Sequence, residues 1–153
     1  MVIISLRYDI HALTQLTKTE SLNILMISPQ FRPLVGGYER AAERLSSELV
    51  KRGHAVTIIT ERRSPEWPKE ERSDGVSIRR LWCLYQPKIH MVTSLCSFSF
   101  FLLFHGHKYD VFHVHQYGIH AGLAVILGKL KGRPVVLKIT STASQSIATT
   151  LNA

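Results

Sequence analysis

The chain has 153 residues, the length of a single domain, and its hydrophobic fraction of 45% excludes a disordered polypeptide. Its 19 Lys and Arg residues against 11 Asp and Glu give a formal charge of +8, which favours anionic partners: phosphate ligands, an acidic membrane surface or nucleic acid. The cysteines Cys83 and Cys96 lack the paired spacing of a zinc or redox motif, so we expect both in or near a core, in a reducing, cytoplasmic compartment.

Residues 1–20 are expected to be an N-terminal extension to a domain that covers residues 21–153. The extension starts with apolar residues 2–4, and Arg7 and Asp9 follow. A secretory signal peptide instead places positive charge before a longer apolar segment and ends in small residues. We therefore predict either a loosely held extension or a start codon assigned too early.

The first elements of the domain are a strand and a helix separated by a glycine pair. Residues 22–28 form an apolar run that stops at Pro29, which is typical of a strand buried on both faces. After a loop and the pair at 36–37, apolar residues recur at helical spacing over residues 38–52. Gly53 ends this helix at the usual glycine position.

Strands and helices continue to alternate along the rest of the chain. Segments rich in β-branched residues predict strands, and an Ala- and Leu-rich segment predicts a helix. Strands are predicted at residues 54–60, 76–82, 110–115 and 134–139, helices at 91–104 and 118–130, and a charged loop at 61–75. This alternation predicts an α/β fold: a Rossmann-like, doubly wound parallel sheet with crossover helices on both faces.

The sheet topology predicts where a ligand binds. With the strands numbered along the chain, the expected order is 3-2-1-4-5, and the switch point lies beside the first strand. Ligands of such sheets bind outside the carboxyl ends of the strands at that point. The loop before the first helix and the ends of the fourth and fifth strands therefore become the segments of interest.

Residues 91–104 are the most apolar run, with fourteen residues and no charge. A helix that spans a bilayer needs about 20 apolar residues, so the run predicts a helix buried on one side. The alternative is a helix that lies in a membrane interface, favoured by the basic charge of the chain.

The Gly36–Gly37 pair opens the first helix, where free N–H groups face a bound anion and glycine lets the backbone approach it. Phosphate is the expected guest, and a flexible turn is the alternative. The dinucleotide fingerprint GxGxxG is missing, because seven residues separate the strand from the pair. NAD binding is therefore disfavoured.

His113 and His115 lie two apart in a strand and share a face. They fall short of a metal site, so we predict no metal and expect packed or hydrogen-bonded histidines. His115 is the candidate catalytic residue, because a polar group at a strand end can orient an acceptor hydroxyl or move a proton. Tyr117 follows it as a candidate binding residue.

Lys138, Thr140 and Ser141 mark the end of the fifth strand, where a lysine and hydroxyls suit sugar or phosphate oxygens. For Ser141, capping of a following helix is the alternative. Basic residues between 62 and 80 are interleaved with acidic ones, which is typical of a solvated loop. Nothing matches a nucleic-acid reading module.

Three stretches, taken in order, resemble the N-terminal domain of glycosyltransferase family 4, the GT-B enzymes. They are PxxGGYER at 33–40, KRGHAVT at 51–57, and DVFHVH at 110–115 followed by KGRPVVLKIT at 131–140. The resemblance covers about residues 22–144 and implies two facing Rossmann-like domains with the active site between them. It implies retaining transfer from a nucleotide-sugar donor to a glycan or lipid-linked acceptor, without a metal or other cofactor.

In this family the N-terminal domain mainly binds the acceptor, and its glycine loop approaches the donor phosphates. By position the donor-phosphate role falls to Gly36 and Gly37. The family's polar residue at the end of the fourth strand corresponds to His115, which would orient the acceptor or assist proton transfer. Tyr117, Lys138, Thr140 and Ser141 become candidates for the acceptor. Many relatives carry a histidine at the end of the fifth strand that contacts the reacting sugar. Thr140 stands there in this sequence, which puts that contact in doubt.

The family's second domain, which grips the nucleotide, is not in this sequence, so we expect an incomplete domain that transfers no sugar alone. Peripheral membrane contact is a further expectation. The alternatives are a non-catalytic phosphate- or nucleotide-binding module, a partner subunit of a split transferase, and an inactive fragment.

Overall fold

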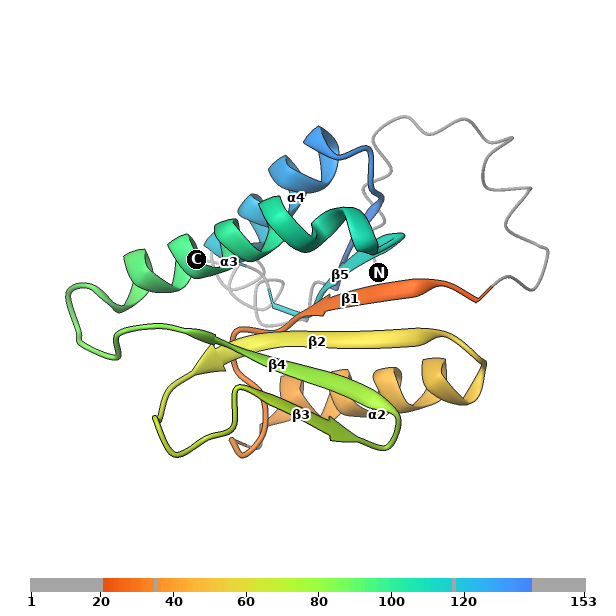
Figure 1. Ribbon diagram of the computed structural model, residues 1–153, viewed down its shortest axis with the longest axis horizontal. Coiled ribbons are helices and arrows are strands. Elements are labelled where there is room, and N and C mark those ends of the chain that lie inside the picture. Colours follow the sequence, from red (N-terminus) through yellow and green to blue (C-terminus); the bar gives the residue numbers. More distant parts are fainter. Residues whose placement is uncertain (1–20, 35, 117, 139–153) are drawn as a thin grey trace, which may run out of the picture.

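The computed structural model of the protein describes residues 21–34, 36–116 and 118–138. These residues form a six-stranded sheet with helices on both faces (Figure 1). The strands are β1 (Asn23–Ile27), β2 (Ala55–Arg62), β3 (Glu70–Ser73), β4 (Val76–Trp82), β5 (Val111–Val114) and β6 (Val135–Leu137). The helices are α2 (Gly37–Lys51), α3 (His90–His105) and α4 (Ile119–Leu130), with a short 3-10 turn, η1 (Gly106–Lys108).

The strand order is β3-β4-β2-β1-β5-β6, and every neighbouring pair except β3 and β4 runs parallel. The five strands predicted from the sequence are therefore confirmed in the predicted order. The fold is a Rossmann-like α/β sheet, and its switch point lies between β1 and β5 (Figure 1).

The prediction of a charged loop at residues 61–75 is wrong at both ends. Strand β2 continues to Arg62, and β3 pairs antiparallel with β4 as an edge strand. The hairpin turns at Asp74 and Gly75, whose φ angles of 51° and 79° suit a two-residue turn. Charge on an edge strand is expected, because it discourages pairing with other chains.

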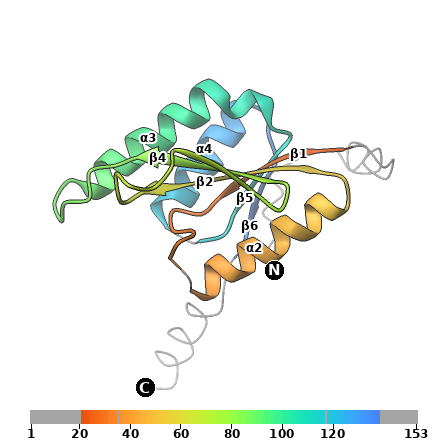
Figure 2. The same cartoon turned by 60° about the horizontal axis from the view of Figure 1, so that its bottom comes forward.

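The sheet is buried on both faces, and alternate residues of β1 explain how. Ile24 and Met26 face the side covered by α2, whereas Leu25 and Ile27 face the side covered by α3 and α4. Figure 2 shows the helices divided between the two faces in this way. A strand covered on both sides must be apolar, which is the pattern at 24–27.

Helix α3 packs one side of its surface on the sheet, as the sequence predicted. Ser94, Phe98, Phe101 and Leu102 are buried, whereas Phe100 is 62% exposed. Within the part of the chain that the structure describes, no helix is both long enough and apolar enough to cross a bilayer. Cys83 is buried, but Cys96 is exposed on α3, so its predicted place near the core is wrong.

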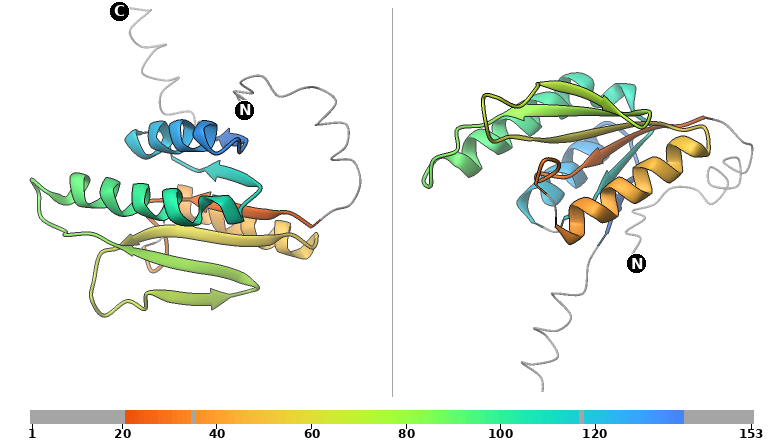
Figure 3. Two further views of the ribbon diagram at one scale, coloured as in Figure 1. Left: turned by 45° about the horizontal axis from the view of Figure 1, so that its top comes forward. Right: turned by 90° about the horizontal axis from the view of Figure 1, so that it is seen from below.

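Helices α3 and α4 lie side by side on the same face (Figure 3). The rings of Phe98 and His120 pack edge to face, with 4.8 Å between their centroids. Helix α4 sits close to β6 because Gly128 has no side chain: a Cβ there would lie 2.3 Å from Val135 Cγ2 and 3.2 Å from Arg133 O. This approach fixes α4 against the strand that carries Lys138 at its end.

Candidate functional site

The carboxyl ends of three neighbouring strands place polar residues in a row. Ile27 pairs with Val114, and Val114 pairs with Leu137. The ladder then continues for one more residue: His115 N donates to Ile27 O at 3.1 Å, and Lys138 N donates to Val114 O at 2.9 Å. Backbone pairing alone therefore brings His115 and Lys138 to the same edge of the sheet.

The start of α2 completes a pocket at this edge. The pocket has a volume of about 270 Å³ and is lined by Gly37, Tyr38, Ala41, His115 and Lys138. Three of the residues predicted from sequence, Gly37, His115 and Lys138, thus meet in one hollow at the switch point. Gly36 lies directly before it as the residue that caps α2. The other candidates, Tyr117, Thr140 and Ser141, lie outside the described residues.

A shallower hollow beside the pocket is basic. It is lined by Gly37, Arg40, Ala41, Arg44, Leu45 and Lys138. Arg40 and Arg44 were not predicted from the sequence, although their spacing from Gly37 on a helix could have placed them on this side. With Lys138 and the positive end of the α2 dipole, they make this surface attractive to anions.

The two glycines differ in the space around them. A Cβ added to Gly37 would meet no atom within 4 Å, whereas one added to Gly36 would lie 2.5 Å from Glu39 Oε2. Glu39 is buried in the first turn of α2. A larger residue at position 37 therefore fills the pocket without disturbing the helix, and one at position 36 displaces a carboxylate.

His113 and His115 hydrogen-bond to each other, with 2.9 Å between His113 Nδ1 and His115 Nε2, as expected for histidines on one face. Burial, and after it the neighbouring His113 and Lys138, lower the pKa of His115 to about 3. Burial and then Lys138 lower the pKa of His113 to about 4. Both rings are therefore neutral at neutral pH.

His115 keeps one ring atom for a ligand. Its side chain is 1% exposed, and among the described residues its Nδ1 has no hydrogen-bond partner. A buried polar atom without a partner is costly, unless a water or a bound molecule satisfies it. Because His115 lines the pocket, a hydroxyl bound there is suited to this nitrogen.

Comparison with known proteins places the chain in a family of glycosyl transferase 4-like domains. A family model described as a glycosyl transferase 4-like domain matches residues 36–150. Sucrose-phosphate synthase from Thermosynechococcus elongatus has a similar structure, with a TM-score of 0.60 and 19% identity over 76% of this chain and 32% of that one. A second structure of sucrose-phosphate synthase from the same organism gives a TM-score of 0.58 and 19% identity, over 80% of this chain and 66% of that one.

At this identity the two structures show a shared fold, that of one half of a GT-B enzyme. The chain spans about a third of the length of the first of them. A sequence search of curated proteins found no match.

Proposed function

This chain belongs to the glycosyl transferase 4-like family, and on that premise we propose that it forms the acceptor-side domain of a retaining GT-B glycosyltransferase. The reaction moves a sugar from a nucleotide-sugar donor to a glycan or lipid-linked acceptor, such as a polysaccharide precursor. The nucleotide sugar is a substrate, and the reaction needs no metal or other resident cofactor. The observation that carries the proposal is the pocket that joins Gly37, His115 and Lys138 at the switch point.

The anionic part of the donor belongs at the start of α2. A leaving nucleoside diphosphate gains negative charge in the transition state. Hydrogen-bond donors and positive charges that are already in position around it lower the activation barrier most. Gly37 leaves room for a phosphate at the helix start, where the first N–H groups have no acceptor within the helix itself. Lys138, Arg40 and Arg44 add positive charge on the same side.

His115 is suited to hold the acceptor rather than to take its proton. A histidine with a pKa of about 3 is a poor base at neutral pH, because its protonated form is too acidic. A neutral ring still donates or accepts a hydrogen bond at Nδ1. The role we assign is orientation of an acceptor hydroxyl next to the donor.

Contact with a membrane surface is a second part of the proposal. Helices α3 and α4 expose apolar side chains on the face opposite α2: Phe100 is 62%, Phe104 59%, Ile126 61% and Leu130 74% exposed. Lys129 is exposed near them. Apolar side chains flanked by lysines favour an anionic bilayer surface, which suits a lipid-linked acceptor.

Transfer of labelled sugar from a panel of nucleotide sugars tests the proposal, with the protein encoded by the full reading frame as the enzyme. Transfer with retention of anomeric configuration supports it. Binding of a nucleoside diphosphate without transfer from any donor, or transfer only after a second chain is added, favours instead a non-catalytic module or one subunit of a split enzyme.

A further inference from the structure

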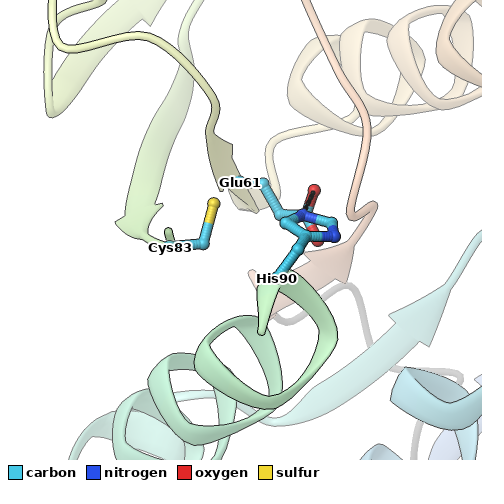
Figure 4. Close-up of side chains that lie close together, drawn as sticks. All are labelled: Glu61, Cys83 and His90. Atoms are coloured by element: carbon cyan, nitrogen blue, oxygen red, sulfur yellow. Dashed lines mark hydrogen bonds and ion pairs between the residues drawn. The ribbon is translucent and has the colours of Figure 1, made fainter. Parts of the chain in front are cut away.

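Three side chains with metal-binding atoms meet at the carboxyl edge of the sheet, away from the pocket at Gly37. Glu61 comes from β2, Cys83 follows β4, and His90 begins α3 (Figure 4). One ligand atom from each residue lies within 4.8 Å of the other two. None of the three residues lines the pocket assigned to sugar transfer.

Glu61 is a buried carboxylate, and such a group needs compensation. Its side chain is 2% exposed. Oε1 accepts a hydrogen bond from Ser94 Oγ at 2.7 Å, and Oε2 lies 2.9 Å from Arg63 Nη2 and 3.1 Å from His90 Nε2. Removing a charge from water costs several kcal/mol unless partners replace the water, and a cation at Oε2 is one such partner.

The spacing of the ligand atoms is close to that of a tetrahedral zinc site. With bonds of about 2.0–2.1 Å to nitrogen and oxygen, two ligands of such a site lie about 3.3 Å apart. Glu61 Oε2 and His90 Nε2 are 3.1 Å apart. Cys83 Sγ lies within 4.8 Å of one ligand atom of each of the other two residues. It needs to move by at most about 1.3 Å to reach the distance of about 3.5 Å that separates a zinc-bound sulfur from a nitrogen or oxygen ligand.

We propose that Glu61, Cys83 and His90 bind a zinc ion, with a water molecule in the fourth position. A thiolate, an imidazole and a carboxylate form a donor set that suits zinc, whereas calcium and magnesium select oxygen ligands alone. The carboxylate and the thiolate together balance the two charges of the ion.

Arg63 already pairs with this carboxylate. Its Nε and Nη2 lie 3.0 Å and 2.9 Å from Glu61 Oε2, and its guanidinium also lies over the ring of Tyr85, 5.3 Å from the centroid. Zinc binding therefore requires Arg63 to release Oε2 while it keeps its contact with Tyr85.

Zinc at this position ties three elements together and does not depend on the proposed sugar transfer. The ligands come from β2, the segment after β4, and the first residue of α3, so the ion closes the start of α3 onto the sheet. Burial, and next to it the charge of Glu61, raises the pKa of the Cys83 thiol. The thiolate is the form that binds zinc, so the ion replaces the thiol proton on binding.

The test uses the purified, reduced 153-residue chain and cobalt as a spectroscopic probe for zinc. We expect cobalt to give a thiolate-to-cobalt charge-transfer band that zinc abolishes at one equivalent per chain. Cys83→Ser is expected to remove the band and weaken zinc binding at least tenfold, to judge from the effect of losing even an outer-shell partner. Cys96→Ser, which alters the exposed cysteine, is the matched control and should leave both unchanged.

Two results overturn the proposal. The first is a wild-type chain that gives no charge-transfer band with cobalt and no rise in melting temperature with zinc. In that case Arg63 and His90 alone compensate the charge of Glu61. A Cys83→Ser chain that binds zinc as tightly as the wild type holds the ion at other histidines. The wild-type spectrum is decisive even where a variant fails to fold.

Discussion

Replacing Phe98 with alanine is expected to lower the free energy of unfolding by about 3–5 kcal/mol. The side chain lies on α3, is 1% exposed, and packs its ring edge to face on His120 at 4.8 Å. Truncation loses the transfer free energy of the ring and leaves a cavity between α3, α4 and the sheet. A domain of this size is stable by about 5–15 kcal/mol in total, so the loss is a large fraction of the whole.

Phe100→Ala is the matched control, because it removes the same atoms from the same helix. Phe100 is 62% exposed, and its truncation is expected to change stability by no more than about 0.5 kcal/mol. Urea unfolding followed by far-ultraviolet circular dichroism measures both. If Phe98→Ala does not fold, Phe98→Leu serves, with an expected loss of about 1–1.5 kcal/mol.

If the two alanine variants lose equal free energy of unfolding, or if Phe100→Ala loses more, the packing of Phe98 against the sheet is refuted. Helix α3 then contacts the sheet through a different side from the one described. The apolar run at 91–104 does not choose between the sides by itself, since it carries phenylalanines on both.

Three further perturbations follow from buried groups, a close helix approach and an exposed surface. Because burial lowers the pKa values of His113 and His115 from 6.5 to about 4 and about 3, the unfolded chain binds more protons in acid. Their contribution to stability is present above about pH 6.5 and is lost as the pH falls toward 3, by up to about 1.4 kcal/mol per pH unit and histidine; urea unfolding from pH 7 to 4 measures it, and a flat profile contradicts it. Gly128→Ala is expected to cost about 1–3 kcal/mol through overpacking, whereas Gly122→Ala, which meets no atom within 4 Å, gains up to about 1 kcal/mol of helix propensity; equal melting temperatures would disprove the close approach. Phe104→Ser should weaken sedimentation with anionic vesicles, because it removes an exposed apolar side chain, and unchanged binding to these vesicles argues against membrane contact through α3.

The strand order was predictable from sequence because each parallel strand carries an apolar run with a helix behind it. The family resemblance was also correct, as the family match at residues 36–150 confirms. The edge strand β3 escaped prediction because its residues, Glu70–Ser73, are nearly all charged or polar, and only its pairing with β4 makes it a strand. Composition describes its solvent exposure, while hydrogen bonding to a neighbour decides its conformation.

The site was predictable in part for a related reason. Strand ends of a parallel sheet share an edge, so His115 and Lys138 could be placed together from sequence. The cluster of Glu61, Cys83 and His90 could not, because its residues come from three separate elements at no motif spacing. The mixed charge around it predicted a solvated loop, but Glu61 and Arg80 are buried.

The pocket at the start of α2 is central to the proposed function, and Gly37→Trp tests its role directly. Position 37 has open space around it, so the indole fills the pocket while the fold and the melting temperature stay unchanged. Sugar transfer by the protein of the full reading frame is the measurement. The rate of sugar transfer is expected to fall about a hundredfold or more, which is the usual cost of losing charge stabilisation in the transition state. Transfer at the wild-type rate with an unchanged melting temperature would contradict the assignment of donor phosphate to this pocket.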